Sequence, residues 1–172
     1  SVQPNAMVDL SFGIVGKDLT TNTAEVASST YSAASGNSAF DSFTGTLTEG
    51  GSSIAIVTQI DLNWENGLEP SYVIGSDTTI QPTDGKSRLT GTLTAYYDSK
   101  ALYDKFINET ASELVLTLTS LEGSSLQIDI PNIKYTGGNP DVDGEGPVTV
   151  SMEFSALYSS SDASQIVFTR TA

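Results

Sequence analysis

Carboxylates are the side chains of this sequence best able to do chemistry, because it holds 21 Asp and Glu residues and neither histidine nor cysteine. Lacking those two types, the chain has no thiol chemistry, no disulfides, no Cys/His metal sites and no imidazole base. Its many serines and threonines would need a lysine as base. The lysines lie in no motif that supports this role: Lys17, Lys86, Lys100, Lys105 and Lys134. No acid lies in an active-site signature, so we predict a protein that is not an enzyme and needs no cofactor.

One acidic cluster has a spacing that could hold calcium. Asp141, Asp143 and Glu145 alternate in the stretch NPDVDGEGP and offer oxygen ligands beside a glycine. The spacing is not that of a complete EF-hand loop, and the sequence enters a strand at Val148. We therefore interpret the cluster as a solvated acidic turn, with a calcium site as the alternative.

Aromatic side chains could stack on sugars if several of them shared one exposed face. Trp64, Tyr97 and Tyr158 fall on the apolar register of their strands, and Tyr103 falls on a helical stripe. We predict that these four rings pack in the core. Tyr96 alone is expected to face outward, and one ring does not make a platform.

The charge of the chain limits its partners. Seven Lys and Arg against 21 Asp and Glu give a net charge of −14, which repels phosphate backbones and disfavours stable binding to nucleic acid. No apolar run reaches the roughly 18 residues of a membrane-spanning helix. The opening SVQPNAMVDL also lacks the features of a signal peptide. A length of 172 residues favours one domain, 1–172, with no membrane partner.

The elements that must position these side chains are mostly strands. Apolar residues alternate with small or polar ones in several segments, as half-buried strands require. The intervening turns favour antiparallel pairing, so we predict a mainly β fold. The predicted strands are 53–65, 88–97, 114–118, 126–130 and 148–158, with terminal strands from Val8, Leu10, Phe12 and Ile14 and from Ile166 and Phe168.

One segment breaks the two-residue period. Leu102, Tyr103, Phe106 and Ile107 recur at helical spacing, with Asp98 or Ser99 available as a cap, so we predict one short flanking helix at about 99–108. The polar stretches 27–37, 75–86 and 136–146 are predicted to be loops or arms. Long loops often become ordered only against a neighbouring molecule.

The order of these segments resembles the phage tail tube family, specifically the major tail tube proteins of long-tailed, non-contractile bacteriophages. RLTGTLTAYYD, the helix ALYDKFINET and the strands ELVLTLTS and SLQIDI follow one another in the family's order. IPNIKYTGG and GPVTVSMEFSALYSS then continue it. Upstream, AFDSFTGTLTEGGSSIAIVTQIDLNWENGLEPSYVIGS is similar to the family's central region.

The resemblance implies a structural virion protein with an antiparallel β-sandwich or barrel-like fold. Its copies would form stacked, hexameric rings around an acidic lumen through which DNA passes transiently during ejection. Implied partners are the chain itself, the tape measure protein and the tail terminator and tip proteins. The protein would be made in the host bacterial cytoplasm and reside in the phage tail. We predict that six polar residues face the lumen: Gln59, Asp61, Asn63, Thr90, Thr92 and Thr94.

Family members are commonly longer before the segment that opens here as SVQPNAMVDLSFGIVGKDL, and residue 1 is not methionine. We therefore expect this to be the C-terminal part of a longer chain. A cell-surface or fibre-type β-sandwich, such as an adhesin or pilus module, is the main alternative. A carbohydrate-binding module, an acid-pair hydrolase, a tail terminator and the tube of a contractile tail or secretion system also stay open.

Overall fold

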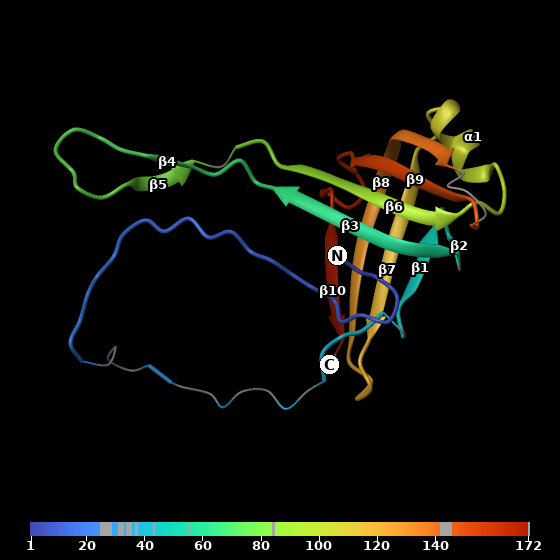
Figure 1. Cartoon of the computed structure of the whole chain (residues 1–172). Coiled ribbons are helices and arrows are strands. Elements are labelled where there is room, and N and C mark those ends of the chain that lie inside the picture. The colour runs from blue at the N-terminus through green and yellow to red at the C-terminus, as the bar shows by residue number, and fades with distance from the viewer. Residues whose placement is uncertain are drawn as a thin grey trace. The chain divides into compact units, whose positions relative to one another are not determined.

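The protein is described by a computed structural model (Figure 1). It covers residues 1–24, 29–30, 33, 36, 38–42, 44–54, 56–83, 85–141 and 146–171, with the backbone alone at 81–83, 139 and 141. Strands and one short helix form the regular structure of these residues. In chain order they are β1 (Thr46–Glu49), β2 (Ser52–Ser53), β3 (Val57–Glu65), β4 (Glu69–Ser71), β5 (Ile80–Thr83), β6 (Arg88–Tyr96), α1 (Ala101–Ile107), β7 (Ser112–Thr119), β8 (Ser125–Asp141), β9 (Thr149–Ala156) and β10 (Val167–Thr171).

The chain divides into two compact units. Unit 1 comprises Ser1–Leu10, Ser38–Glu65 and Arg88–Ala172, and unit 2 comprises Ser11–Asn37 and Asn66–Ser87. Unit 1 holds the large sheet and the helix, whereas unit 2 holds the two-stranded sheet of β4 and β5.

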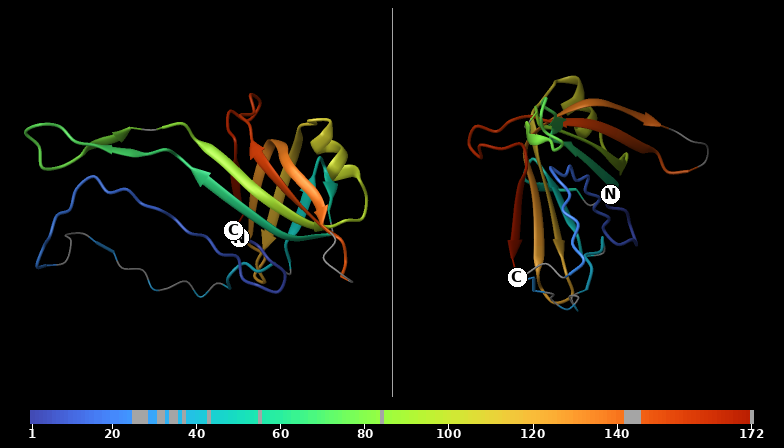
Figure 2. Two further views of the ribbon diagram at one scale, coloured as in Figure 1. Left: turned by 45° about the horizontal axis from the view of Figure 1, so that its top comes forward. Right: turned by 90° about the vertical axis from the view of Figure 1, so that its left-hand side faces the viewer.

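The large sheet of unit 1 is antiparallel throughout, with the strand order β2-β1-β7-β8-β9-β6-β3, and β10 also pairs with β8. The 17-residue strand β8 joins its two parts. Residues 125–133 pair with β7, and residues 133–141 pair with β9. Figure 2 shows how the strands of this unit curve around a shared interior. The prediction of a mainly β, antiparallel fold with one short helix is confirmed.

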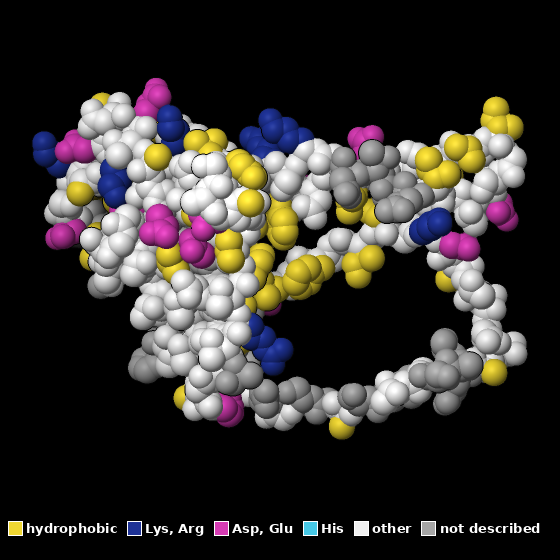
Figure 3. Space-filling model, turned by 180° about the vertical axis from the view of Figure 1, so that it is seen from behind, with side chains coloured by type: hydrophobic (Ala, Val, Ile, Leu, Met, Phe, Trp, Pro, Cys, Tyr) yellow, Lys and Arg dark blue, Asp and Glu magenta, His cyan; other side chains and the backbone are white. Residues whose placement is uncertain are grey.

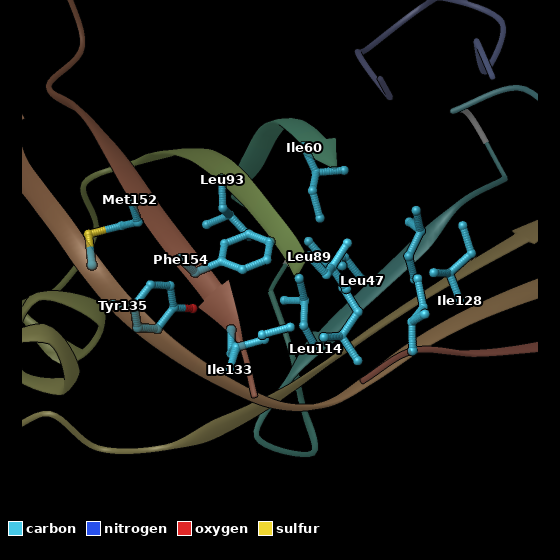
Figure 4. Close-up of a cluster of buried hydrophobic side chains, with 14 of the residues drawn as sticks. Leu47, Ile60, Leu89, Leu93, Leu114, Ile128, Ile133, Tyr135, Met152 and Phe154 are labelled. Atoms are coloured by element: carbon cyan, nitrogen blue, oxygen red, sulfur yellow. The ribbon is translucent and has the colours of Figure 1, made fainter. Parts of the chain in front are cut away.

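The core of unit 1 follows from the two-residue period of its strands. In β9, Val150, Met152, Phe154 and Ala156 are buried, while the residues between them point outward. Phe154 lies among side chains from β6 and β8 (Figure 4). Full burial of a side chain of this size stabilises the fold by about 1.5–3 kcal/mol. The partner side chains shown there include Leu47, Ile60, Leu89, Leu93, Leu114, Ile128, Ile133 and Tyr135.

The predicted helix is confirmed as α1, which is shorter than the predicted range. Neither Asp98 nor Ser99 is its N-cap residue, since Lys100 holds that position without a side-chain cap bond. The Ser99 hydroxyl accepts a hydrogen bond from the Ala101 N–H at 3.4 Å. Leu102 and Phe106 pack against the core, as the helical stripe predicts.

Two predicted loops contain strands. β5 lies inside 75–86, and β8 continues to residue 141 through the first part of 136–146. Backbone hydrogen bonds to β9 hold this end of β8 in the sheet. These bonds form whatever the side chains are, so the segment is a strand without alternating apolar residues. Residue 138 of this segment has to be glycine, because a Cβ at this position would lie 2.1 Å from the Met152 sulfur of β9. Of 27–37, only residues 29, 30, 33 and 36 are described, and they form neither helix nor strand.

Two further predictions were wrong: the strand at the start of the sequence, and the burial of three aromatic rings. The opening residues Val8, Leu10, Phe12 and Ile14 form no strand, although the terminal strand β10 does form. The predicted core rings Trp64, Tyr97 and Tyr158 are 48%, 39% and 62% exposed. They lie near or beyond strand ends, where alternation continues but the sheet no longer covers the side chain. Tyr103 is partly buried.

A buried ion pair fastens α1 to the sheet. The Lys105 ammonium pairs with the Glu49 carboxylate of β1, which is almost fully buried, and donates to the Ser112 hydroxyl at 3.2 Å. The Tyr135 hydroxyl donates to the same carboxylate at 3.4 Å. Burial and the Glu49 charge raise the pKa of Tyr135 above its ordinary value, so this hydroxyl stays protonated and keeps donating.

We expect Lys105→Met to lower the free energy of unfolding by on the order of 3 kcal/mol, because it leaves a buried carboxylate without its cation. Urea unfolding followed by circular dichroism measures the change. The control is Lys100→Met, which breaks the exposed i,i+4 pair with Asp104 and should cost less than about 1 kcal/mol. Equal losses in the two variants would contradict a structural role for the buried pair.

Gly91 has no room for a side chain. An added Cβ would lie 2.5 Å from the Phe154 ring and 2.6 Å from the Asp61 carbonyl oxygen. We expect Gly91→Ala to destabilise the protein by roughly 1–3 kcal/mol, the usual cost of overpacking a core. In urea unfolding, the matched variant Gly16→Ala should change stability by less than about 0.5 kcal/mol, because its Cβ meets nothing within 4 Å. A neutral Gly91→Ala variant would show that the ring has space to move.

Candidate functional site: a polar sheet face with two open edges

The six predicted lumen residues lie together on one face of the sheet. Along β3 and β6 they form three directly opposed pairs: Gln59 with Thr94, Asp61 with Thr92, and Asn63 with Thr90. The intervening residues Ile60, Leu89 and Leu93 are buried in the core. The six therefore occupy the outer, polar side of this pair of strands. Whether that side lines a lumen stays a prediction.

Strand β9 extends this face. Ser151, Glu153 and Ser155 lie opposite Thr94, Thr92 and Thr90. These three residues are absent from the predicted lumen set. The alternation of GPVTVSMEFSALYSS could have identified them, because its buried residues leave the odd positions facing outward. We call the nine residues on β3, β6 and β9 the polar face.

The polar face carries more negative than positive charge. Asp61 and Glu153 are its two charged members, and Glu65 and Arg88 form the next pair at its end. The Gln59 amide donates to Asp61, and the Asn63 amide donates to Glu65 at 3.1 Å. These bonds hold the acids in line along β3. A shallow hollow of about 470 Å³ lies between the three strands.

The residues of this face suit contact better than catalysis. Its hydroxyl and amide groups have no base or nucleophile pair among them. Among the residues that the structure describes, no group of three or more His, Cys, Asp or Glu side chains could hold a metal ion. Of the calcium candidates, Asp141 is described by its backbone alone, and Asp143 and Glu145 lie outside the described residues. The solvated acidic turn stays a prediction, with the calcium site as its alternative.

The outer edge of β3 has bonding groups available. The Ile60 N–H donates to the Val2 carbonyl oxygen at 3.0 Å, and the Ile60 carbonyl oxygen accepts from the Val2 N–H at 2.9 Å, across this edge. Because these groups alternate sides along a strand, Leu62 also directs its N–H and C=O to this edge. No described strand pairs with β3 there.

The far edge of β8 likewise has no described strand beside it, although α1 packs against β8. Its pairing with β7 ends at Ile133, and residues 134–141 have β9 on one side and no described strand on the other. The strands β3, β6, β9 and this part of β8 therefore form a four-stranded antiparallel sheet. No described strand pairs with its two outer sides, which we call the open edges. Such edges are templates for pairing with another chain.

Comparison with known proteins gives the family. The model of the phage tail tube protein family matches residues 1–156, so the chain belongs to this family. It is a structural protein of the virion tail and not an enzyme. No curated protein matches the chain. In the described part of the chain, the helix is too short and too polar to cross a membrane.

Solved structures share the fold at low sequence identity. The tube terminating cap of the anti-feeding prophage is 12% identical with a TM-score of 0.57, over 86% of this chain and 100% of that chain. The sheath/tube terminator of the PVC extracellular contractile injection system in its extended state is 13% identical with a TM-score of 0.56, over 74% and 94%. The sheath–tube complex of the PVC system is 12% identical with a TM-score of 0.55, over 76% and 90%. At these identities the likeness shows the fold alone.

Proposed function

We propose that copies of this chain join edge to edge into closed rings, expected to be hexameric, which stack into the hollow tail tube. The observation that carries the proposal is the four-stranded sheet with its two open edges. Ring formation would satisfy both edges at once, since β3 of one copy pairs with β8 of the next.

The even number of strands supports this closure. Adjacent strands alternate in direction, so β3 and β8 run in opposite directions at the two edges. In a ring all copies have the same orientation about the axis. The β3 strand of the next copy therefore meets β8 antiparallel, and the pattern continues around the ring without interruption.

In this ring the polar face lines the bore. The opposite face of the same strands is the buried core, so the exposed hydroxyls, amides and acids are the groups that a closed sheet presents. The carboxylates of Asp61 and Glu153 repel phosphate. The short Ser and Thr side chains of the polar face do not project into the bore. Duplex DNA would pass without being retained. The net charge of −14 acts in the same direction.

The remaining assignments follow from the family resemblance. The rings would assemble around the tape measure protein between the tail tip and terminator proteins. The segments 27–37 and 75–86 would contribute ring-to-ring contacts. We further propose a long, non-contractile tail, whose micrographs should show the tube without a sheath.

The ring is tested at the β3 edge. Negative-stain electron microscopy of the parent protein across concentration should show rings or tubes with a bore wide enough for duplex DNA. Leu62→Pro removes an N–H on the open edge while leaving the ladder with β6 intact, so we expect a folded monomer without rings. Leu62→Met keeps the N–H and should still form rings. Rings from Leu62→Pro, with its circular dichroism unchanged, would exclude pairing through this edge.

The acidic bore is tested by reversing its charge. We expect tubes of Asp61→Lys/Glu153→Lys to retain duplex DNA at low salt and release it as salt rises, whereas parent tubes retain none. Co-sedimentation of labelled DNA with tubes measures this. The control Asp18→Lys/Asp98→Lys makes the same charge change at exposed residues outside the polar face. If tubes of both variants retained equal amounts of DNA, Asp61 and Glu153 would not line the bore.

A further inference from the structure

The negative charge of the chain is not spread evenly over its surface. Figure 3 shows Lys and Arg side chains lying among Asp and Glu side chains on one side of the molecule, so the net charge of −14 does not describe every part of it. Two basic residues lie near one end of the sheet that carries the polar face: Arg88 at the start of β6, and Lys134 in β8. Both are absent from the predicted lumen set.

The strand register places both cations on the same side of the sheet as the polar face. Lys134 lies directly opposite Ser155 of β9, and Ser155 lies directly opposite Thr90 of β6. Directly opposed residues of antiparallel strands share one face of the sheet. Arg88 precedes Thr90 by two residues, so its side chain points to that face as well. It lines the hollow of about 470 Å³ described above.

The spacing of the two cations suits an anion held between them. Arg88 and Lys134 are two strand spacings and two residues apart, which separates their Cα atoms by about 12 Å. The Thr90 and Ser155 hydroxyls lie between them. Lysine has a flexible four-carbon stem, and the guanidinium of arginine presents N–H donors that match the geometry of a phosphate group. A phosphate at this position would meet two cations and two hydroxyl donors.

The acids nearby leave these cations available. In the part of the chain that the structure describes, no carboxylate lies within ion-pair distance of Arg88. Glu65 lies opposite Arg88 on β3, and its carboxylate accepts from the Asn63 amide at 3.1 Å. Lys134 pairs with Glu109 at 3.9 Å, and these side chains are 42% and 81% exposed. An ion pair this exposed is weak, so a phosphate group can replace Glu109.

We propose that Arg88 and Lys134 form a phosphate-binding belt in the bore, which contacts the DNA backbone as it passes. The proposal rests on the ring argued above, in which all copies have the same orientation and hold these two side chains at one level along the axis. Duplex DNA suits such a belt, because its phosphates form a continuous negative surface. One belt recurs in each ring of the tube.

The acids of the polar face keep this contact transient. Glu153 precedes Ser155 by two residues, about 7 Å along β9. Charges in salt solution are screened over roughly 8 Å at physiological ionic strength. A phosphate at the belt is therefore attracted by the nearer cations and partly repelled by the neighbouring row of Asp61 and Glu153. The belt contacts DNA, and the acids prevent parent tubes from retaining it.

Removing the acids without adding cations isolates the belt. We expect tubes of Asp61→Asn/Glu153→Gln to retain labelled duplex DNA at low salt, roughly fivefold or more above parent tubes in co-sedimentation. Adding Arg88→Gln/Lys134→Gln should return retention to the parent level. The control adds Arg170→Gln/Lys100→Gln instead, which removes the same types of cation at exposed residues outside the polar face. This control should leave retention unchanged.

The salt dependence of binding gives a second measurement. Each phosphate contact contributes about 0.9 to the slope of log affinity against log salt concentration. In tubes of Asp61→Lys/Glu153→Lys, adding Arg88→Gln/Lys134→Gln should lower this slope by roughly one or more. An unchanged slope would overturn the belt. Retention of polyglutamate by Asp61→Asn/Glu153→Gln tubes as strongly as DNA would also overturn it, because the site would then not recognise phosphate.

The outcomes separate the belt from the ring. If the parent protein formed no rings, both proposals would fail. If tubes of Asp61→Asn/Glu153→Gln formed but retained no more DNA than parent tubes, the belt alone would be overturned. The same holds if they retained as much DNA after Arg88→Gln/Lys134→Gln was added. In both of these cases the ring would stand.

Discussion

Backbone pairing along β8 is the constraint on which the rest of the structure depends. The first part of this continuous strand pairs with β7 and β10, and its second part pairs with β9. An extra β8 residue is accommodated on the β7 side between Ile130 and Ile133, and another on the β9 side between Tyr135 and Gly137. Such bulges bend a strand and increase its twist. Pro131 lies at the first bulge, where a missing N–H costs little. The bend lets one sheet enclose its own core.

This enclosure gives the strands two chemically different faces. Phe154 and its neighbours fill the interior, and the Gly91 backbone leaves space for the ring. The outward residues are then free of packing demands and can be threonine, serine, amide or acid. The same ladder leaves the open edges of β3 and β8 without a described strand, and such edges can pair with another chain. Core packing, polar face and open edges are therefore consequences of a single arrangement of strands.

Sequence reasoning succeeded where side chains carry the signal. Alternation identified β6 and β9, and from it followed the grouping of Asp61 with Thr92 on one face. It failed where the backbone carries the signal: the TGGNPD end of β8 has no apolar period but is held by its ladder with β9. It also failed for Trp64, whose register is apolar although the sheet ends too soon to cover it. Open edges depend on which strands lack a neighbour, and alternation within a strand does not report this.

The pairing of Val2 with Ile60 has a further consequence for the proposed ring. It occupies the β3 edge at one residue, so a neighbouring strand can pair only from Leu62 onward. A register slip of one residue would turn every outward side chain of the incoming strand toward the core face. A fixed starting point therefore keeps the polar faces of successive copies continuous. In the proposed ring, Val2 would help to set the register in this way, although it belongs to no strand.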